Sequence, residues 1–142
     1  MRVEELMSEA TCCRETDTVR ACAKLMKDED IGFAPICDTE GRPIGAVTDR
    51  DLVIRVIADG LSPDAPLAKV MSRDAIACQM GDGVEKAMEL MRNERVSRVM
   101  VVDDQDKLKG VISLQDLAQA SEEDEAGETL QEVKSDAPPS MH

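Results

Sequence analysis

The sequence is almost without aromatic side chains: its 142 residues include one Phe and no Trp or Tyr. Apolar residues still make up 42% of the chain, so a core must be built from Ala, Val, Ile, Leu and Met. The nine methionines are therefore expected to serve mainly as adaptable core packing. A chain of this length can form one compact domain or two very small units that share a core.

Basic residues are also scarce, since 17 Lys and Arg stand against 30 Asp and Glu and give a net charge of -13. Phosphate binding needs a basic surface, so neither nucleic acid nor an anionic membrane is the expected partner. No apolar run approaches the roughly 18–20 residues that span a bilayer. The stretch from Met1 to Glu5 lacks the basic start and apolar core of a signal peptide, so we expect a cytoplasmic protein.

Metal-ligating residues are few. His142 is the only histidine, and the five cysteines include no Cys-x-x-Cys pair. Zinc sites usually need three or four Cys, His or carboxylate ligands, so no metal is predicted. An odd number of cysteines without a secretory signal does not indicate a disulfide framework. The adjacent Cys12 and Cys13 could bind a soft metal or form a redox switch, but burial in or near a strand is the favoured interpretation.

What the chain does contain is an internal repeat. The stretch Gly45–Leu52 returns as Gly110–Leu117, and each copy has Gly, two apolar residues, a hydroxyl, two variable residues, a carboxylate and Leu. An offset of 65 positions aligns further residues before each copy, and still earlier the offset drops to 64. This change places one inserted residue near 80–83. A repeat of this extent predicts two similar structural units.

Each repeat has the same predicted order of elements, β-α-β-β-α, so the expected fold class is α+β. A short strand comes first, at 11–14 or 75–78, and Thr16 or Asp17 is the expected N-cap of the helix that follows. Two strands that pair as a hairpin then lead into the repeated stretch and the last helix. The first helix of each repeat shows an apolar face at helical spacing. Its residues are Val19, Cys22, Ala23 and Met26 in the first repeat and Val84, Ala87, Met88 and Met91 in the second.

Composition divides the chain into four parts. The first repeat covers 1–60, a Pro- and Ser-containing linker covers 61–66, and the second repeat covers 67–120. The acidic segment 121–142 lacks the apolar content to pack and is expected to be disordered. The helix at 52–58 is apolar nearly all round and needs cover on more than one side, so we expect a homodimer.

The hydroxyl and carboxylate of the repeated stretch, Thr48 with Asp51 and Ser113 with Asp116, have the spacing of a helix capping box. The hydroxyl would cap the helix, and the carboxylate would favour its positive end. The same geometry suits a nucleotide, because amide N–H groups at a helix start can receive a phosphate. A carboxylate one turn into the helix can also accept two hydrogen bonds from a ribose diol. The two interpretations are compatible, because a ligand can use a capping box.

Neighbouring residues extend this hypothesis to the base. Gly45 and Gly110 would let a planar base approach the backbone, and Val47 or Ile112 could cover its face. Phosphate, ribose and base would then each have a place.

Two other functions stay open. Catalysis could use Asp49 and Asp51, but side chains two residues apart point to different sides of a helix. The body of the chain also has neither a histidine nor a nucleophile elbow. The second alternative is a ligand-free module that forms dimers and docks a partner protein.

The tandem units, closed by Gly-Ala-Val-Thr-Asp-Arg-Asp and Gly-Val-Ile-Ser-Leu-Gln-Asp, resemble a CBS-domain pair over about residues 3–120. The stretch from Ile31 to Ile36 resembles the strand start that is usual in this family. The chain is similar to small bacterial members made only of the pair. This resemblance implies a regulatory sensor that is not an enzyme, requires no cofactor and acts on an unknown protein. Its expected ligands are AMP, ADP or ATP, and in some members NAD or S-adenosylmethionine.

The resemblance also implies two pseudo-symmetric clefts, each closed by the motif of one repeat and the strand start of the other. Because Arg98 matches Phe33, we expect cleft one to prefer a phosphorylated ligand and cleft two to take adenosine-like groups. The family commonly forms dimers through its helices. Cleft one would use Thr48, Asp51, Val96 to Arg98, Ala75 and Ile76. Cleft two would use Ser113, Asp116, Gly32, Phe33, Thr11 and Cys12.

Overall fold

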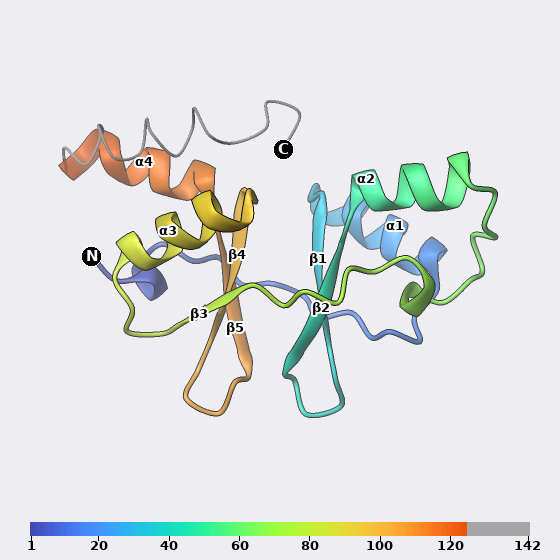
Figure 1. Cartoon of the computed structure of the whole chain (residues 1–142), viewed down its shortest axis with the longest axis horizontal. Helices are drawn as coiled ribbons and strands as arrows, with labels where there is room; N and C mark the ends of the chain where they lie inside the picture. The colour runs from blue at the N-terminus through green and yellow to red at the C-terminus, as the bar shows by residue number, and fades with distance from the viewer. Residues whose placement is uncertain (125–142) are drawn as a thin grey trace. The chain divides into compact units, whose positions relative to one another are not determined.

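The two repeated stretches lie in two separate compact units of the computed structural model (Figure 1). The Thr48 unit comprises Ala10–Ala75, and the Ser113 unit comprises Met1–Glu9 together with residues 76–124. The structure describes residues 1–124. Of the segment predicted to be a disordered tail, residues 125–142 therefore lie outside the described residues, and the four residues before them are helical.

The Thr48 unit is built on an antiparallel hairpin in which Phe33 lies opposite Thr48. A segment ahead of the hairpin adds one parallel bridge, from Cys13 to Ile36. The last helix begins directly after Thr48, as predicted, and changes from α-helical to π-helical hydrogen bonding. The elements are α1 (Val19–Glu29), β1 (Phe33–Cys37), β2 (Pro43–Thr48), α2 (Asp49–Leu52), the π-helical η2 (Val53–Ala58) and the short 3-10 helix η3 (Leu67–Lys69).

The Ser113 unit repeats this plan with one strand more. Its first strand lies parallel to the first hairpin strand, and in the hairpin itself Arg98 lies opposite Ser113. Both units are α+β and show the predicted hairpins. The predicted first strand is present in the Ser113 unit as β3, whereas the strand predicted at 11–14 was wrong, because the Thr48 unit has only the bridge at Cys13 there. The elements are η1 (Val3–Glu5), β3 (Ala77–Gln79), α3 (Val84–Glu94), β4 (Arg98–Val102), β5 (Leu108–Ser113) and α4 (Leu114–Asp124).

The first residues of each repeat pack into the unit that carries the other repeat's motif. Val3 of η1 is fully buried in the core of the Ser113 unit, and Leu67 of η3 is fully buried in the core of the Thr48 unit. Ser8 forms a bridge to β5, whereas Ser72 forms the matching bridge to β2. The sequence repeats and the compact units are therefore different divisions of the chain.

The extra residue of the second repeat lies earlier than the predicted position at 80–83. Cys13 and Cys78 hold the same place beside the first hairpin strand, and their numbers already differ by 65. Ser8 and Ser72, which hold equivalent bridges, differ by 64. The insertion therefore falls between Ser72 and Cys78, in the segment that leads into β3.

The predicted N-cap of α1 was wrong by one or two residues. Thr18 is the cap, and its Oγ1 accepts a hydrogen bond from Ala21 N–H over 3.1 Å. Asp17 is instead engaged in the preceding turn, where its Oδ2 accepts from Arg14 N–H over 2.8 Å. The predicted apolar face of α1 is buried except for Ala23, which is exposed at the edge of the stripe.

An aspartate side chain holds the turn of each hairpin. Asp38 Oδ1 accepts hydrogen bonds from the N–H groups of Glu40 and Arg42, and Asp103 Oδ1 accepts from the N–H groups two and four residues further on. These hydrogen bonds hold the pKa of both carboxyls below their ordinary value. The two turns thus share the same backbone hydrogen bonds, and Asp103 in addition forms an ion pair with Lys109 over 3.6 Å.

The cores are aliphatic, as the composition predicts. The largest fully buried side chains include Ile36 and Leu67 in the Thr48 unit and Met100, Ile112 and Leu117 in the Ser113 unit. Five methionines are buried, which agrees with their predicted use as core packing. Among residues 1–124, no helix combines the length and apolar character that crossing a bilayer requires.

Candidate functional site

The hydroxyl and carboxylate of each motif form a reciprocal capping box. Asp51 N–H donates to Thr48 Oγ1 over 3.2 Å, and Thr48 N–H donates to Asp51 Oδ2 over 2.8 Å. In the Ser113 unit, Asp116 N–H donates to Ser113 Oγ over 3.0 Å, and Ser113 N–H donates to Asp116 Oδ2 over 2.8 Å. All four side chains are half-buried. The capping interpretation is therefore correct for both copies, and such a cap typically stabilises a protein by about 1 kcal/mol.

The start of each hairpin lies against the capping box of its own unit. Asp49 N–H donates to the Gly32 carbonyl over 3.0 Å, and Leu114 N–H donates to the Ser97 carbonyl over 2.8 Å. The strand register also puts Phe33 opposite Thr48 in one unit. In the other unit, Arg98 lies opposite Ser113. Each unit thus brings a strand start, a hydroxyl and a carboxylate together. The pairing of each motif with the other repeat's strand start stays a prediction.

The structure gives the two motif glycines a packing role. A Cβ on Gly110 would lie 2.7 Å from the Ser8 carbonyl oxygen, and a Cβ on Gly45 would overlap the Ser72 carbonyl oxygen. Those carbonyls accept hydrogen bonds from the residues that follow the glycines, each over 2.9 Å. Glycine is therefore needed where two backbone segments of one unit meet. Sequence reasoning had linked these glycines only to a ligand base, because the partner segments are distant in the chain.

The apolar motif residues Val47 and Ile112 are fully buried in the cores of their own units. Inward-facing residues of a strand alternate with outward-facing ones, and these two positions face inward. Their side chains therefore have a packing role, and a ligand base would have to be covered by other groups.

The remaining predicted site residues lie in the leading segments, which are the stretches 11–14 and 75–78 ahead of the first helix of each repeat. Thr11 and Cys12 are exposed, and the Thr11 hydroxyl donates to the Glu29 carboxylate over 3.3 Å. Ala75 is exposed, whereas Ile76 is half-buried and its carbonyl accepts a hydrogen bond from Met100 N–H of β4 over 3.0 Å. Because the inserted residue lies before β3, the offset of 65 between Cys13 and Cys78 also applies here, and Thr11 is equivalent in position to Ile76.

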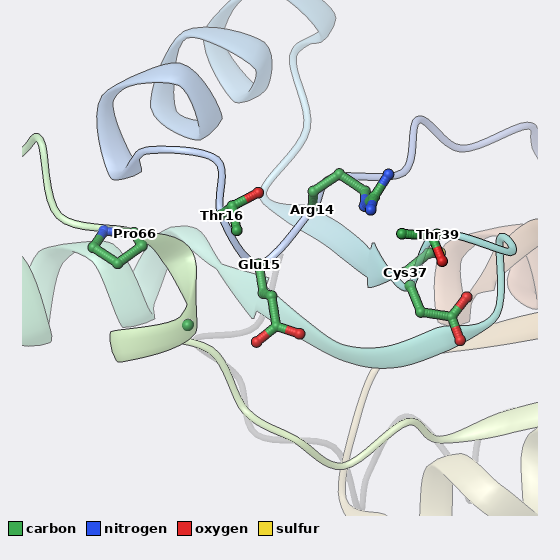
Figure 2. Close-up of a pocket in the computed structure, with 8 residues that line it drawn as sticks. Arg14, Glu15, Thr16, Cys37, Thr39 and Pro66 are labelled. Carbon is green, nitrogen blue, oxygen red and sulfur yellow. The ribbon is translucent and has the colours of Figure 1, made fainter.

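A hollow of about 410 Å³ lies in the Thr48 unit, at the turn end of the hairpin and so away from Thr48 (Figure 2). Figure 2 shows Arg14, Thr39 and Cys37 grouped at one end and Pro66 at the other. The leading segment, the turn after β1 and the linker all contribute to it. Sequence reasoning missed this hollow because its walls come from segments far apart in the chain.

The cysteines do not form a metal centre. No group of three or more His, Cys, Asp or Glu side chains within residues 1–124 is arranged to hold a metal ion. Cys13 is buried in the core, where the neighbouring Cys22 thiol and burial both raise its pKa. In the Ser113 unit, burial raises the pKa of Cys78 to about 11. The favoured burial of the adjacent pair is therefore correct for Cys13 and wrong for Cys12, which is exposed.

The chain belongs to the CBS domain family, whose model matches residues 3–58 and 67–123. It is 36% identical over 105 residues to the uncharacterized protein MK0525 of Methanopyrus kandleri, covering 73% of this chain and 54% of that protein. It is 35% identical over 109 residues to hypoxic response protein 1 of Mycobacterium tuberculosis, covering 76% of each. The chain thus spans about half of the first relative and three quarters of the second.

Solved structures of CBS proteins share the fold. Hypoxic response protein I, crystallised with two coordinated zinc ions, matches with a TM-score of 0.75 and 30% identity, over 84% of this chain and 98% of that one. The CBS domain pair of protein MJ0100, in complex with 5′-methylthioadenosine and S-adenosyl-L-methionine, matches with a TM-score of 0.77 and 21% identity, over 87% and 97%. The predicted tandem CBS pair is therefore confirmed.

Proposed function

We propose that the chain is a regulatory module that binds adenosyl ligands, with AMP, ADP or ATP as the expected class, and catalyses no reaction itself. The observation that carries this proposal is the pair of half-buried capping boxes at Thr48–Asp51 and Ser113–Asp116. An ionised carboxylate offers about four acceptor positions, and the Thr48 N–H uses one of them on Asp51. Asp51 can therefore accept a ribose diol while it keeps its contact with Thr48.

The MJ0100 complex supports the adenosyl part of the proposal. That CBS pair holds two ligands that share an adenosyl group and differ in the sulfur substituent. A site that recognises the ribose diol and the base would accept this shared part in the same way as it accepts that of a nucleotide. The carboxylates at Asp51 and Asp116 are the groups that we assign to the diol.

We propose two sites of unequal chemistry, because the two strand starts differ. Arg98 and Phe33 hold matched positions at the beginnings of β4 and β1. A guanidinium recognises phosphate bidentately, whereas a phenyl ring offers only a stacking surface. We assign Arg98 to the site of Thr48 and Asp51, which should prefer a phosphorylated ligand. Calorimetry that finds two equal sites, both requiring phosphate, would contradict this assignment.

A panel of thermal melts on the full chain tests the function. The ligands are AMP, ADP, ATP, NAD, S-adenosylmethionine and 5′-methylthioadenosine, with GTP and ribose 5-phosphate as controls. A ligand at 100 times its Kd stabilises a protein by about 2.7 kcal/mol, which raises the Tm by several degrees. If no adenosyl compound raises the Tm, the proposal fails. Product analysis after incubation with ATP or AMP should show no turnover.

A homodimer is the partner that the helix surface favours. Val53, Ile54 and Ile57 of η2 are 55%, 41% and 77% exposed, whereas Leu52 and Val56 are buried in the core of the unit. One apolar face of the helix at 52–58 is therefore covered and another is left exposed. Ile57→Asp should convert a dimer into a monomer in light scattering, whereas Met80→Asp, at an exposed apolar residue in the Ser113 unit, should not. If dimerisation persists in Ile57→Asp, another surface mediates it. If the chain is a dimer and no adenosyl compound raises its Tm, the alternative function, a ligand-free module that docks a partner protein, is favoured.

A further inference from the structure

Cys12 and Cys37 form a thiol pair at the edge of the Thr48 unit. Their Sγ atoms lie 2.8 Å apart, within hydrogen-bonding distance. Cys12 is exposed on the leading segment, whereas Cys37, the last residue of β1, is 1% exposed. One sulfur can therefore be reached from solvent, and the other lies directly behind it.

The backbone explains why these two cysteines meet. Cys13 N–H donates to the Pro35 carbonyl and Cys37 N–H donates to the Cys13 carbonyl, each over 2.9 Å. The leading segment thus runs parallel to β1, with Cys13 opposite Ile36. Side chains alternate between the two faces of a strand, so Cys12 lies on the face of Cys37, and Cys13 points into the core. The adjacent pair Cys12–Cys13, considered from the sequence, is therefore not the pair that the fold brings together.

We propose that Cys12 and Cys37 are a modification site at which hydrogen peroxide produces a reversible intramolecular disulfide. The Cys12 thiolate attacks one peroxide oxygen, the O–O bond breaks, and the released hydroxide takes up a proton to become water. Cys12 is then a sulfenic acid. The Cys37 thiol loses its proton and attacks the Cys12 sulfur, the S–S bond forms, and the S–O bond breaks to release a second water. Two thiols lose two electrons in total, and the peroxide gains them.

The surroundings assign the order of these two steps. Burial and the adjacent Cys12 thiol raise the pKa of Cys37, which keeps it as a thiol. The thiolate is the reactive nucleophile, and Cys12 is the sulfur that a peroxide in solution can reach. Cys12 is therefore oxidised first, and Cys37 resolves the sulfenic acid before it can be oxidised further.

The Ser113 unit provides a natural comparison. Its residues at the places of Cys12 and Cys37 are Ala77 and Val102, which follow from the strand register. The fold therefore does not need cysteine at either place. The disulfide is independent of the proposed ligand, because it depends only on contacts inside the Thr48 unit.

Peptide mapping of the full chain tests the site. Reduced protein is treated with hydrogen peroxide, free thiols are alkylated, and the protein is digested with trypsin without reductant. Arg and Lys positions place Cys37 and Cys22 in separate tryptic peptides, and fragmentation distinguishes Cys12 from Cys13. We expect a linked Cys12–Cys37 peptide that dithiothreitol cleaves. The matched variant Cys78→Ala should give the same linked peptide.

Cys12→Ser changes an exposed side chain and should fold normally, which circular dichroism verifies, but it should give no linked peptide and leave Cys37 alkylatable after unfolding. Three outcomes would overturn the proposal. They are a bond from Cys12 to Cys13 or Cys22, a bond between two chains only, and irreversible oxidation of Cys12 without any linked peptide.

Discussion

The two units follow the same plan, but the leading segment is held more firmly in one than in the other. In the Ser113 unit, Met100 N–H donates to the Ile76 carbonyl over 3.0 Å, and a three-residue strand forms. The matched position in the Thr48 unit is Pro35, which has no N–H to donate. The leading segment there makes a single bridge at Cys13. One proline therefore explains why the same place in the fold is a strand in one unit and an exposed thiol segment in the other.

The helices after the motifs differ in a second way. Val53, Ile54 and Ile57 are exposed on η2, whereas the residues 65 positions later are Ala118, Gln119 and Glu122. The motif itself, with its capping box, is the same in both units. The capping geometry is therefore common to the two units, whereas within residues 1–124 the exposed apolar side chains on the helix after the motif and the close thiol pair are found in the Thr48 unit.

The largest effect that would separate the units is expected at the motif glycines. A Cβ on Gly45 would overlap both the Ser72 carbonyl and the Met71 side chain, whereas on Gly110 it would lie 2.7 Å from the Ser8 carbonyl and 2.8 Å from the flexible Met7 side chain. Overpacking typically costs about 1–3 kcal/mol. Gly45→Ala should therefore lower the free energy of unfolding by roughly 3 kcal/mol and Gly110→Ala by roughly 1–2 kcal/mol.

Urea unfolding curves of the two glycine variants provide the measurement. Gly41, which has no atom within 4 Å of its would-be Cβ, has a positive φ and is therefore an unsuitable control, because alanine would be strained there. An alanine at the exposed Thr39 is the better reference and should change stability little. Equal losses at the two glycines would show that the two backbone junctions are equally adaptable.

A smaller effect is expected at the carboxylates. Asp51→Asn keeps a side-chain oxygen for the Thr48 N–H but loses the charge and half of the acceptors for a ribose diol. A hydrogen bond to a charged group contributes about 1.5–3 kcal/mol, so AMP and ATP should bind roughly 10–100-fold more weakly. Asp116→Asn should weaken the phosphorylated ligands less, because Arg98 is assigned to the other site.

Isothermal titration of both aspartate variants measures this difference, with melting curves of the ligand-free proteins to verify the fold. Unchanged affinity in Asp51→Asn would remove the ribose assignment. Equal losses in both variants would remove the assigned inequality of the two sites and leave the function itself intact.

Local signals in the sequence were sufficient for much of this structure. The capping boxes at Thr48 and Ser113 and the hairpin turns at Asp38 and Asp103 depend on residues within four positions of one another. Such short-range chemistry repeats wherever the residues repeat, and the internal repeat made it visible twice. The fold class and the start of each last helix followed from these signals.

Contacts between distant segments could not be predicted in the same way. Nothing near Ser8 indicates that it pairs with β5, and nothing near Cys12 distinguishes Cys37 from Cys13 as its neighbour. The N-cap at Thr18 was missed because Asp17 is engaged by the Arg14 backbone, a competition that the residue types alone do not decide. The hollow beside Cys37 was missed for the related reason that three separate segments build it.

The smallest expected effect concerns pH, and it should have the same direction in both units. Backbone hydrogen bonds, led by the Arg42 N–H for Asp38 and the Lys107 N–H for Asp103, lower both pKa values from 3.8. A carboxyl whose pKa is lowered in the folded state stabilises the protein above its unfolded pKa, and this contribution is lost as the pH falls through the folded value. Asp38→Asn should therefore lower the Tm slightly at neutral pH. The difference from the wild type should shrink as the pH falls below 3.8 and disappear below the lowered pKa of the folded state. Asp103→Asn should respond in the same direction in calorimetric scans. A gap that stays constant at low pH would show that the turn depends on side-chain geometry and not on charge.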